Sequence, residues 1–165
     1  MEALPGTYLL ILHAAQAQNI TVGRLGMLAV RPGWYVYVGS AFGPGGVRAR
    51  VGRHLRGDGR LHWHIDFLRR VAVIEQVGYT LDPSPQEHAW GQLVAAMPGA
   101  VIPLTGFGSS DCHCATHLIY FAKSPDLRAA EHQGFKPQIF TVPSSKTAAK
   151  RQPSGEKASA AGLVW

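Results

Sequence analysis

The first forty residues show the alternation of apolar and polar positions that is typical of β-strands. Residues 6–13 form an apolar stretch after a Pro-Gly step, and residues 34–40 alternate so that tryptophan and valines share one face and tyrosines the other. Residues 19–30 carry two glycines at turn positions and predict a short hairpin. Because the connections are short, the pattern predicts neighbouring antiparallel strands.

After a glycine-rich break, the spacing of the apolar residues changes to that of a helix. Val47, Val51 and Leu55 recur every four residues, which predicts a short amphipathic helix with this stripe facing the core. A second helix is expected over residues 61–70, and a strand over residues 71–79.

The second half of the chain predicts a third helix, a last strand and one more short helix. Ser84 and Glu87 have the spacing of a capping box, so the third helix is expected to begin at Ser84 and to run to about residue 97. The last strand is expected over residues 115–122 and the last helix over residues 124–133.

Together these elements predict an α+β fold in which a small, mainly antiparallel sheet is flanked by helices. The chain of 165 residues has room for one domain with a substantial core. We expect that domain over residues 1–140. Residues 141–165 are rich in Ser, Ala, Lys and Pro, and we expect them to form a disordered basic tail.

The charge balance favours a polyanionic partner. The chain has 16 Lys and Arg against 10 Asp and Glu, a formal net charge of +6, and each phosphate that a basic protein neutralises releases counterions. Seven arginines and no lysine lie between residues 48 and 70, and the guanidinium fork suits bidentate phosphate contacts. The alternative is a solvated helical face.

The composition does not indicate a membrane protein or a secreted one. No stretch reaches the ~20 apolar residues that a membrane-spanning helix needs, and the apolar residues near the start lack the basic segment of a secretory signal. Cys112 and Cys114 are too close in sequence for an ordinary structural disulfide, so a cytoplasmic protein is expected.

Two glycine–tyrosine motifs, a helical arginine–histidine pair and a later glutamate supply groups that phosphodiester cleavage needs. In chain order, these residues are Gly6, Tyr8, Tyr37, Gly39, Arg50, His54 and Glu87. Cleavage needs an activated water, neutralisation of the charge on the phosphoryl group and stabilisation of the leaving oxygen. Two phenols, a guanidinium, an imidazole and a carboxylate that holds a divalent cation provide these functions.

This ordered set resembles the GIY-YIG nuclease superfamily over residues 6–97. The segments 62–66 and 106–112 look like a less characterised prokaryotic branch of that superfamily. The resemblance implies a metal-dependent endonuclease that hydrolyses phosphodiester bonds in nucleic acid, with DNA favoured over RNA. It also implies that Glu87 binds the metal, one Mg²⁺ or Mn²⁺ per site.

The resemblance also suggests a role for each residue. We expect Tyr37 to act as the base or to orient water, with Tyr8 as its partner and Arg50 on the phosphate oxygens. Nearby cations are expected to lower the high pKa of the tyrosine, and His54 is an alternative proton acceptor. Further candidates are phosphate contacts and loop groups: Arg48, Arg53, His62, His64, Ser110 and Asp111.

Simpler explanations exist for individual residues. A half-buried tyrosine usually serves packing, and Glu87 has a competing role in the capping box. The spacing from Tyr37 to Arg50 is longer than usual, which makes Arg48 a rival; we keep Arg50 because a histidine follows it at the matching offset. The same fold could bind nucleic acid without cutting it efficiently, and a partner protein could supply specificity.

Residues 112–114 and His117, together with His62 and His64, are candidates for a zinc site. A strand beginning at Ala115 would point neighbouring side chains to opposite faces, so zinc is not favoured and free cysteines are expected. A zinc-stabilised interaction protein remains the third class of function.

Overall fold

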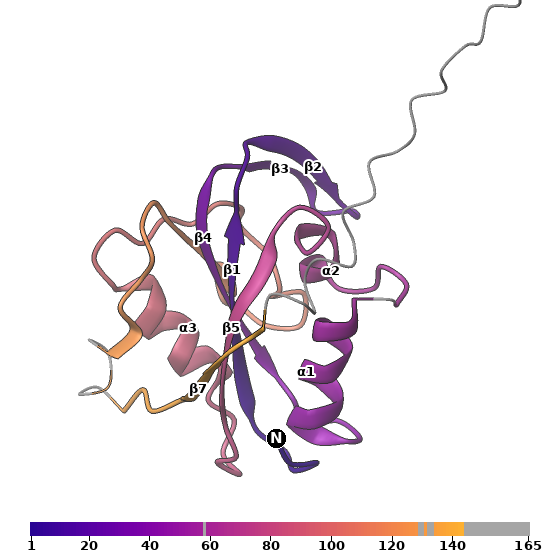
Figure 1. The fold of residues 1–165 in the computed structure, drawn as a ribbon, viewed down its shortest axis with the longest axis vertical. Helices are drawn as coiled ribbons and strands as arrows, with labels where there is room; N and C mark the ends of the chain where they lie inside the picture. The colour runs from indigo at the N-terminus through magenta and orange to yellow at the C-terminus, as the bar shows by residue number, and fades with distance from the viewer. Residues whose placement is uncertain (58, 129–130, 132–133, 144–165) are drawn as a thin grey trace, which may run out of the picture.

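A five-stranded antiparallel sheet forms the centre of the computed structural model, which describes residues 1–57, 59–128, 131 and 134–143 (Figure 1). The strands lie in the order β6-β4-β1-β5-β7, and every neighbouring pair is antiparallel. Their bounds are Leu118–Phe121 for β6, Gly33–Ser40 for β4, Thr7–Ala14 for β1, Val73–Thr80 for β5 and Gln138–Thr141 for β7. The predicted α+β class with an antiparallel sheet is confirmed.

A separate hairpin connects β1 to β4. Its strands β2 (Gln18–Val22) and β3 (Gly26–Val30) pair only with each other among the described residues. This hairpin was expected over residues 19–30.

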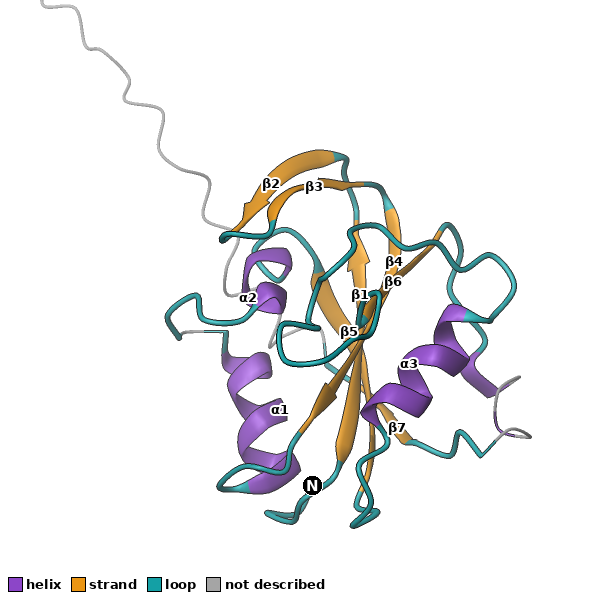
Figure 2. Ribbon diagram, turned by 180° about the vertical axis from the view of Figure 1, so that it is seen from behind, coloured by secondary structure: helices purple, strands orange, loops and turns teal. Residues whose placement is uncertain are grey.

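The helices cover both faces of the central sheet. Helices α1 (Gly46–Arg56) and α2 (His64–Leu68) lie on one face, and α3 (Glu87–Ala95) lies on the other (Figures 1 and 2). Because side chains alternate along a strand, β1 contributes to a core on each face. Leu10 belongs to the cluster that contains α1, and Leu9 belongs to the cluster that contains α3.

The structure corrects the expected start of the third helix. The residue that precedes α3 is Gln86, which makes no side-chain cap, and the Ser84 amide instead donates to the Asp82 carboxylate in a turn. The Gln86 amide donates to Oγ1 of Thr7 at 3.0 Å. A tertiary contact with β1 therefore fixes the start of this helix, and the predicted capping box is wrong.

Two other helices differ from the predicted pattern. In α1, His54 is fully buried beside Val47 and Val51, whereas Leu55 is only partly buried. The second helix is shorter than predicted, and Asp66 accepts the backbone amides around its start. The inward stripe of α1 is therefore not wholly apolar, because it includes an imidazole.

The C-terminal third departs most from the expectation. β6 begins at Leu118 rather than Ala115, and β7 was not predicted. β7 ends at Thr141 and Val142 is buried, so ordered structure extends slightly past the predicted boundary at residue 140. Most of the predicted tail, residues 144–165, lies outside the described residues, as does part of the helix expected over 124–133.

Among the described residues, no helix combines the length and the apolar character needed to cross a bilayer.

Candidate functional site

A cleft of about 430 Å³ opens at one end of the central sheet. It is lined by residues of β1, β4, α1, α2 and α3 and of the loops at residues 42–43, 62–63 and 108–111. Eight of the residues predicted from sequence line it: Tyr8, Tyr37, Arg50, His62, His64, Glu87, Ser110 and Asp111. The structure therefore brings together residues that are spread over a hundred positions of the chain.

The register of β1 against β4 places the two tyrosines on one face of the sheet. Tyr8 pairs with Gly39 and Leu10 pairs with Tyr37, and the Tyr8 and Tyr37 ring centroids lie 6.4 Å apart. A Cβ atom on Gly39 would lie 2.5 Å from the Tyr8 ring, so this position must be glycine for the phenol to occupy its place. Glycine is required at position 6 for a different reason, because an added Cβ there would collide with the Thr80 carbonyl.

Glu87 reaches the cleft from the helix on the opposite face of the sheet. This is feasible because the pairing of β4 with β6 ends at Tyr37. Beyond that point the neighbour of β4 is a loop, and the Val38 amide donates to the His117 carbonyl of that loop. The first turn of α3 can therefore pass the edge of β4. The Glu87 side chain is 20% exposed, and it has no capping role, which removes the structural explanation that competed with metal binding.

Arg50 is the helical arginine that the structure places in the cleft. Its guanidinium lies over the Trp63 ring, 4.4 Å from the centroid, and its charge acts on both tyrosines. Arg48 is exposed and does not line the cleft. The preference for Arg50 over Arg48 thus agrees with the geometry.

His54 lies behind the cleft and contacts it through Tyr8. Its Nε2 is 2.9 Å from the Tyr8 hydroxyl, while its Nδ1 has no hydrogen-bond partner among the residues that the structure describes. Burial, and next the cationic Arg69, lower the pKa of His54 to about 3. His54 is therefore a neutral imidazole at neutral pH and does not supply the positive charge that was expected beside the tyrosines.

The two phenols are also weaker acids than the sequence analysis assumed. Burial, and then the Glu87 carboxylate, raise the pKa of Tyr37 despite the opposing charge of Arg50. Burial and the neighbouring Tyr37 raise the pKa of Tyr8 well above its ordinary value. In the protein without a bound cation, both groups are protonated phenols at neutral pH.

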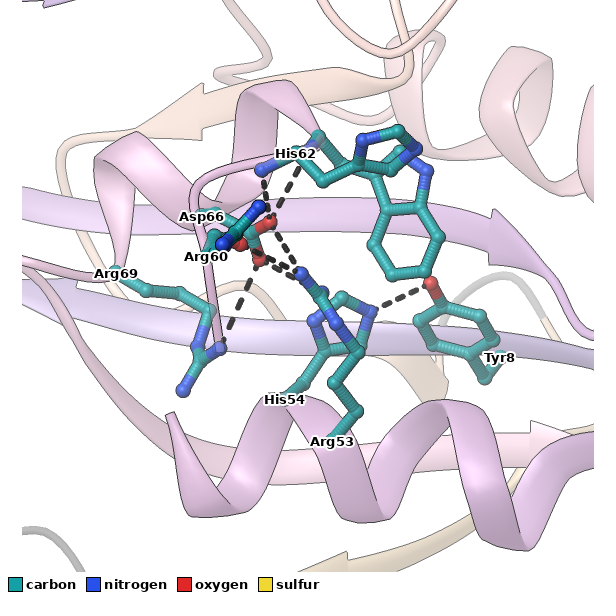
Figure 3. A network of polar contacts seen from close by, with 8 residues as sticks. Tyr8, Arg53, His54, Arg60, His62, Asp66 and Arg69 are labelled. Carbon is teal, nitrogen blue, oxygen red and sulfur yellow. Dashed lines mark hydrogen bonds and ion pairs between the residues drawn. The ribbon is translucent and has the colours of Figure 1, made fainter. Parts of the chain in front are cut away.

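Arg53 was predicted to contact phosphate, but the structure places it in an internal ion pair. Its two terminal nitrogens donate to the two carboxylate oxygens of Asp66 at 2.9 and 2.7 Å, and Arg69 approaches the same carboxylate (Figure 3). Burial acts to raise the pKa of Asp66, but hydrogen bonds from Arg53, Trp63 and His62 lower it to about 2. This network holds the segment that carries Trp63 against α1.

The two histidines of that segment have different surroundings. Nδ1 of His64 accepts the Gly108 amide at 3.0 Å and so attaches the later loop to α2. His62 is exposed and its ring packs edge-on against Trp63. His62 is therefore the more available of the two for a ligand.

A second group of polar side chains lies next to the cleft and could hold a metal ion. One ligand atom from each of four residues lies within 4.8 Å of the others: His88, Cys112, Cys114 and His117. Both cysteines are free. Two sulfur and two nitrogen donors fit zinc better than Mg²⁺, which prefers oxygen.

Zinc was not favoured from the sequence because a strand was expected from Ala115. The strand begins at Leu118 instead, so residues 112–117 form a loop whose side chains are free to converge. His62 and His64 do not take part, and His88 from α3 does. The Cys-x-Cys-x-x-His spacing was the available signal, and the fourth ligand is distant in sequence.

The sequence pattern of a family described as "Domain of unknown function DUF123" matches residues 7–138. The chain belongs to the DUF123 family. The DUF123 match runs from the first residue of β1 to the first residue of β7. It therefore includes the eight predicted residues of the cleft and the four residues of the metal-ligand group. No curated protein and no solved structure matches the chain.

Proposed function

We propose that this chain is an endonuclease of the GIY-YIG type that uses one divalent cation to hydrolyse phosphodiester bonds in nucleic acid, with DNA favoured over RNA. The observation that carries the proposal is the meeting of Tyr8, Tyr37, Arg50 and Glu87 in one cleft. Tyr8 and Tyr37 also belong to the buried core, but packing does not account for the guanidinium and the carboxylate beside them.

The residues of the cleft fit a hard divalent cation. Glu87 and Asp111 both line it and offer carboxylate oxygens, the ligands that Mg²⁺ and Mn²⁺ prefer. Among the described residues, the one ion-pair partner of Glu87 is Nδ1 of His117 at 3.2 Å. When bound, the cation neutralises phosphate charge and makes a coordinated water more acidic.

The remaining tasks belong to the side chains of the chain itself. Arg50 is held by its stacking on Trp63 and would donate to the non-bridging oxygens of the scissile phosphate. As water adds to phosphorus it gives up one proton, the bond to the leaving oxygen breaks, and that oxygen takes up one proton, so that no net proton is consumed. Arg50 stabilises the charge that accumulates on the phosphoryl oxygens meanwhile.

Tyr37 is the group we assign to the attacking water. In the metal-free state, the protonated Tyr37 would orient water through its hydroxyl oxygen. The Glu87 carboxylate helps to raise the Tyr37 pKa, and a divalent cation bound at Glu87 would offset that negative charge. Tyr8 contributes through its hydrogen bond to His54. The neutral His54 ring can accept a proton, although its low pKa makes it a weak base.

The test is nicking of supercoiled plasmid by the full chain in Mg²⁺ or Mn²⁺. We expect Glu87→Gln and Arg50→Ala each to lower the rate about 100-fold or more, because each removes charge stabilisation at the phosphate. Arg48→Ala is the matched control, since it removes an exposed arginine from the same helix outside the cleft. We expect its rate to stay within about twofold of the wild type.

One alternative has a specific observation in its favour. The buried, protonated tyrosines suit a module that binds nucleic acid without cutting it. That alternative predicts binding that weakens steeply with salt, together with no nicking in either cation. A nicking activity that is equal in the wild type and in Glu87→Gln would come from a contaminant and would contradict the nuclease proposal.

A further inference from the structure

The group formed by His88, Cys112, Cys114 and His117 has the donors and the spacing of a zinc site. Nδ1 of His88 lies 3.0 Å from Sγ of Cys114, and Nε2 of His117 lies 3.4 Å from Sγ of Cys112. A tetrahedral zinc with ordinary Zn–S and Zn–N bonds has edges of about 3.5 Å between sulfur and nitrogen ligands. Small shifts of these side chains would therefore complete a tetrahedron.

His117 provides the observation that points most directly to a ligand. Its side chain is 1% exposed. A Glu87 oxygen lies 3.2 Å from its Nδ1, but within the described part of the chain this nitrogen makes no hydrogen bond of good geometry. Buried imidazole nitrogens are normally satisfied. A metal on Nε2 and a proton on Nδ1 that is donated to Glu87 would satisfy both nitrogens, and carboxylate–histidine–zinc arrangements of this kind are the rule for histidine ligands.

The loop that carries three of the ligands has little regular structure of its own. Residues 105–117 contain no helix or strand. Backbone hydrogen bonds from Gly106 to Ala115 and from His117 to Phe107 tie the two ends of the loop together, whereas the Cys112 amide, near the loop's tip, makes a longer bond of 3.4 Å to the Ser109 carbonyl. The same loop places Ser110 and Asp111 in the cleft. A metal that joined the loop to the first turn of α3 would fix these residues in position.

We propose that His88, Cys112, Cys114 and His117 bind one structural Zn²⁺, which joins the loop at residues 105–117 to α3 beside the cleft. Four protein ligands fill a tetrahedral coordination sphere and leave no open position for substrate, so the ion is structural rather than catalytic. Glu87 is shared between the two sites, since it lines the cleft and faces the outer nitrogen of His117.

Two metal-free arrangements compete with this proposal. The sulfur and nitrogen atoms could make only the weak hydrogen bonds that their distances allow. A Cys112–Cys114 disulfide would close a ring around a single intervening residue, which is a strained geometry. Neither arrangement explains the convergence of all four side chains.

The test is the zinc content of the full chain, purified without a histidine tag and reconstituted with excess Zn²⁺ under reducing conditions. We expect one zinc per chain after removal of loosely bound metal, and Zn–S distances near ~2.3 Å by X-ray absorption. His88→Ala and Cys114→Ser should lose the zinc. His113→Ala is the matched control, because His113 adjoins the cluster without belonging to it and should keep the zinc.

A second measurement covers the case in which the variants do not fold. Co²⁺ bound by the wild-type chain should give the intense absorption of a tetrahedral site with thiolate ligands, and Zn²⁺ should displace it. Each of three results would overturn the proposal. The reconstituted wild type could lack stoichiometric zinc, a Cys112–Cys114 disulfide could persist under reducing conditions, or the folded His88→Ala variant could keep its zinc. None of these results depends on nuclease activity, so the zinc site and the nuclease can fail separately.

Discussion

The cleft and the neighbouring zinc-type cluster are built in different ways, although they share Glu87. Most side chains of the cleft come from separate strands and helices, and packing and hydrogen bonds such as Tyr8–His54 hold them in place, whereas Ser110 and Asp111 come from the loop that also carries the cluster. Three of the four cluster residues come from one loop without regular structure. We infer that the cleft is largely preformed, whereas the cluster depends on its metal for order.

The largest expected effect comes from removing the zinc that we propose the cluster binds. A strong chelator should increase the hydrogen exchange of the amides between Gly108 and His117 by about 1,000-fold, because the binding energy of a structural zinc is lost from this loop. Amides of β1 and β4 should change little. Exchange measured by mass spectrometry before and after chelation checks this, and equal loosening of both regions would contradict the proposed difference.

Asp66→Asn should destabilise the cleft side of the molecule without affecting the cluster. Asp66 is 6% exposed and pairs with Arg53 through both oxygens, and removing one charge of a largely buried ion pair costs about 3 kcal/mol. Urea unfolding measures this loss. Zinc content should remain one per chain, and a folded variant that lacked zinc would show that the two regions are not independent.

Gly39→Ala should disturb the cleft directly. The added Cβ would lie 2.5 Å from the Tyr8 ring, and overpacking of this kind costs about 2 kcal/mol. The nicking rate should fall with the stability, because the phenol must move. Gly91→Ala is the matched control, since a Cβ there has no neighbour within 4 Å; it should be neutral or slightly stabilising in the interior of α3.

The smallest expected effect is a pH dependence that comes from His54. Its pKa is about 3 in the folded protein and near 6.5 when unfolded. The unfolded chain therefore binds the proton more readily, so the stability from a neutral His54 is fully present above pH 6.5 and declines as the pH falls. At about pH 5.5 the loss is about 1 kcal/mol.

His54→Leu isolates this contribution from other groups that titrate in the same range. The unfolding free energy of the wild type minus that of the variant should fall by that amount when the pH is lowered from 7.5 to 5.5. A difference that does not change with pH would show that His54 is not held neutral by burial.

Local patterns in the sequence were enough to predict the strands of the first half and the positions of the cleft residues along them. The alternation at β1 and β4 sets which tyrosines share a face, and Arg50 follows from its helical offset to His54. The start of α3 was wrong because Thr7, almost eighty residues away, fixes it in place of the local cap. Propensity rules do not include such a contact.

For a related reason, the sequence could not show that Arg53 pairs with Asp66 or that His88 belongs to the metal-ligand group. An arginine in a basic stretch looks the same whether it faces solvent or pairs with a buried carboxylate, and the ion pair of Arg53 with Asp66 is visible only in three dimensions. His88 lies 26 positions from Cys114. No sequence-spacing motif links a histidine on α3 with cysteines in a loop that is far away in the sequence.

The hydrogen bond from the Gln86 amide to the Thr7 hydroxyl has a consequence for the reacting groups, because each partner is the immediate neighbour of one of them. Thr7 precedes Tyr8 and Gln86 precedes Glu87, so a single contact between adjacent positions fixes how far the phenol stands from the carboxylate. If the proposed function holds, a side chain outside the cleft thereby helps set the width of the gap into which a phosphate and its cation would have to fit.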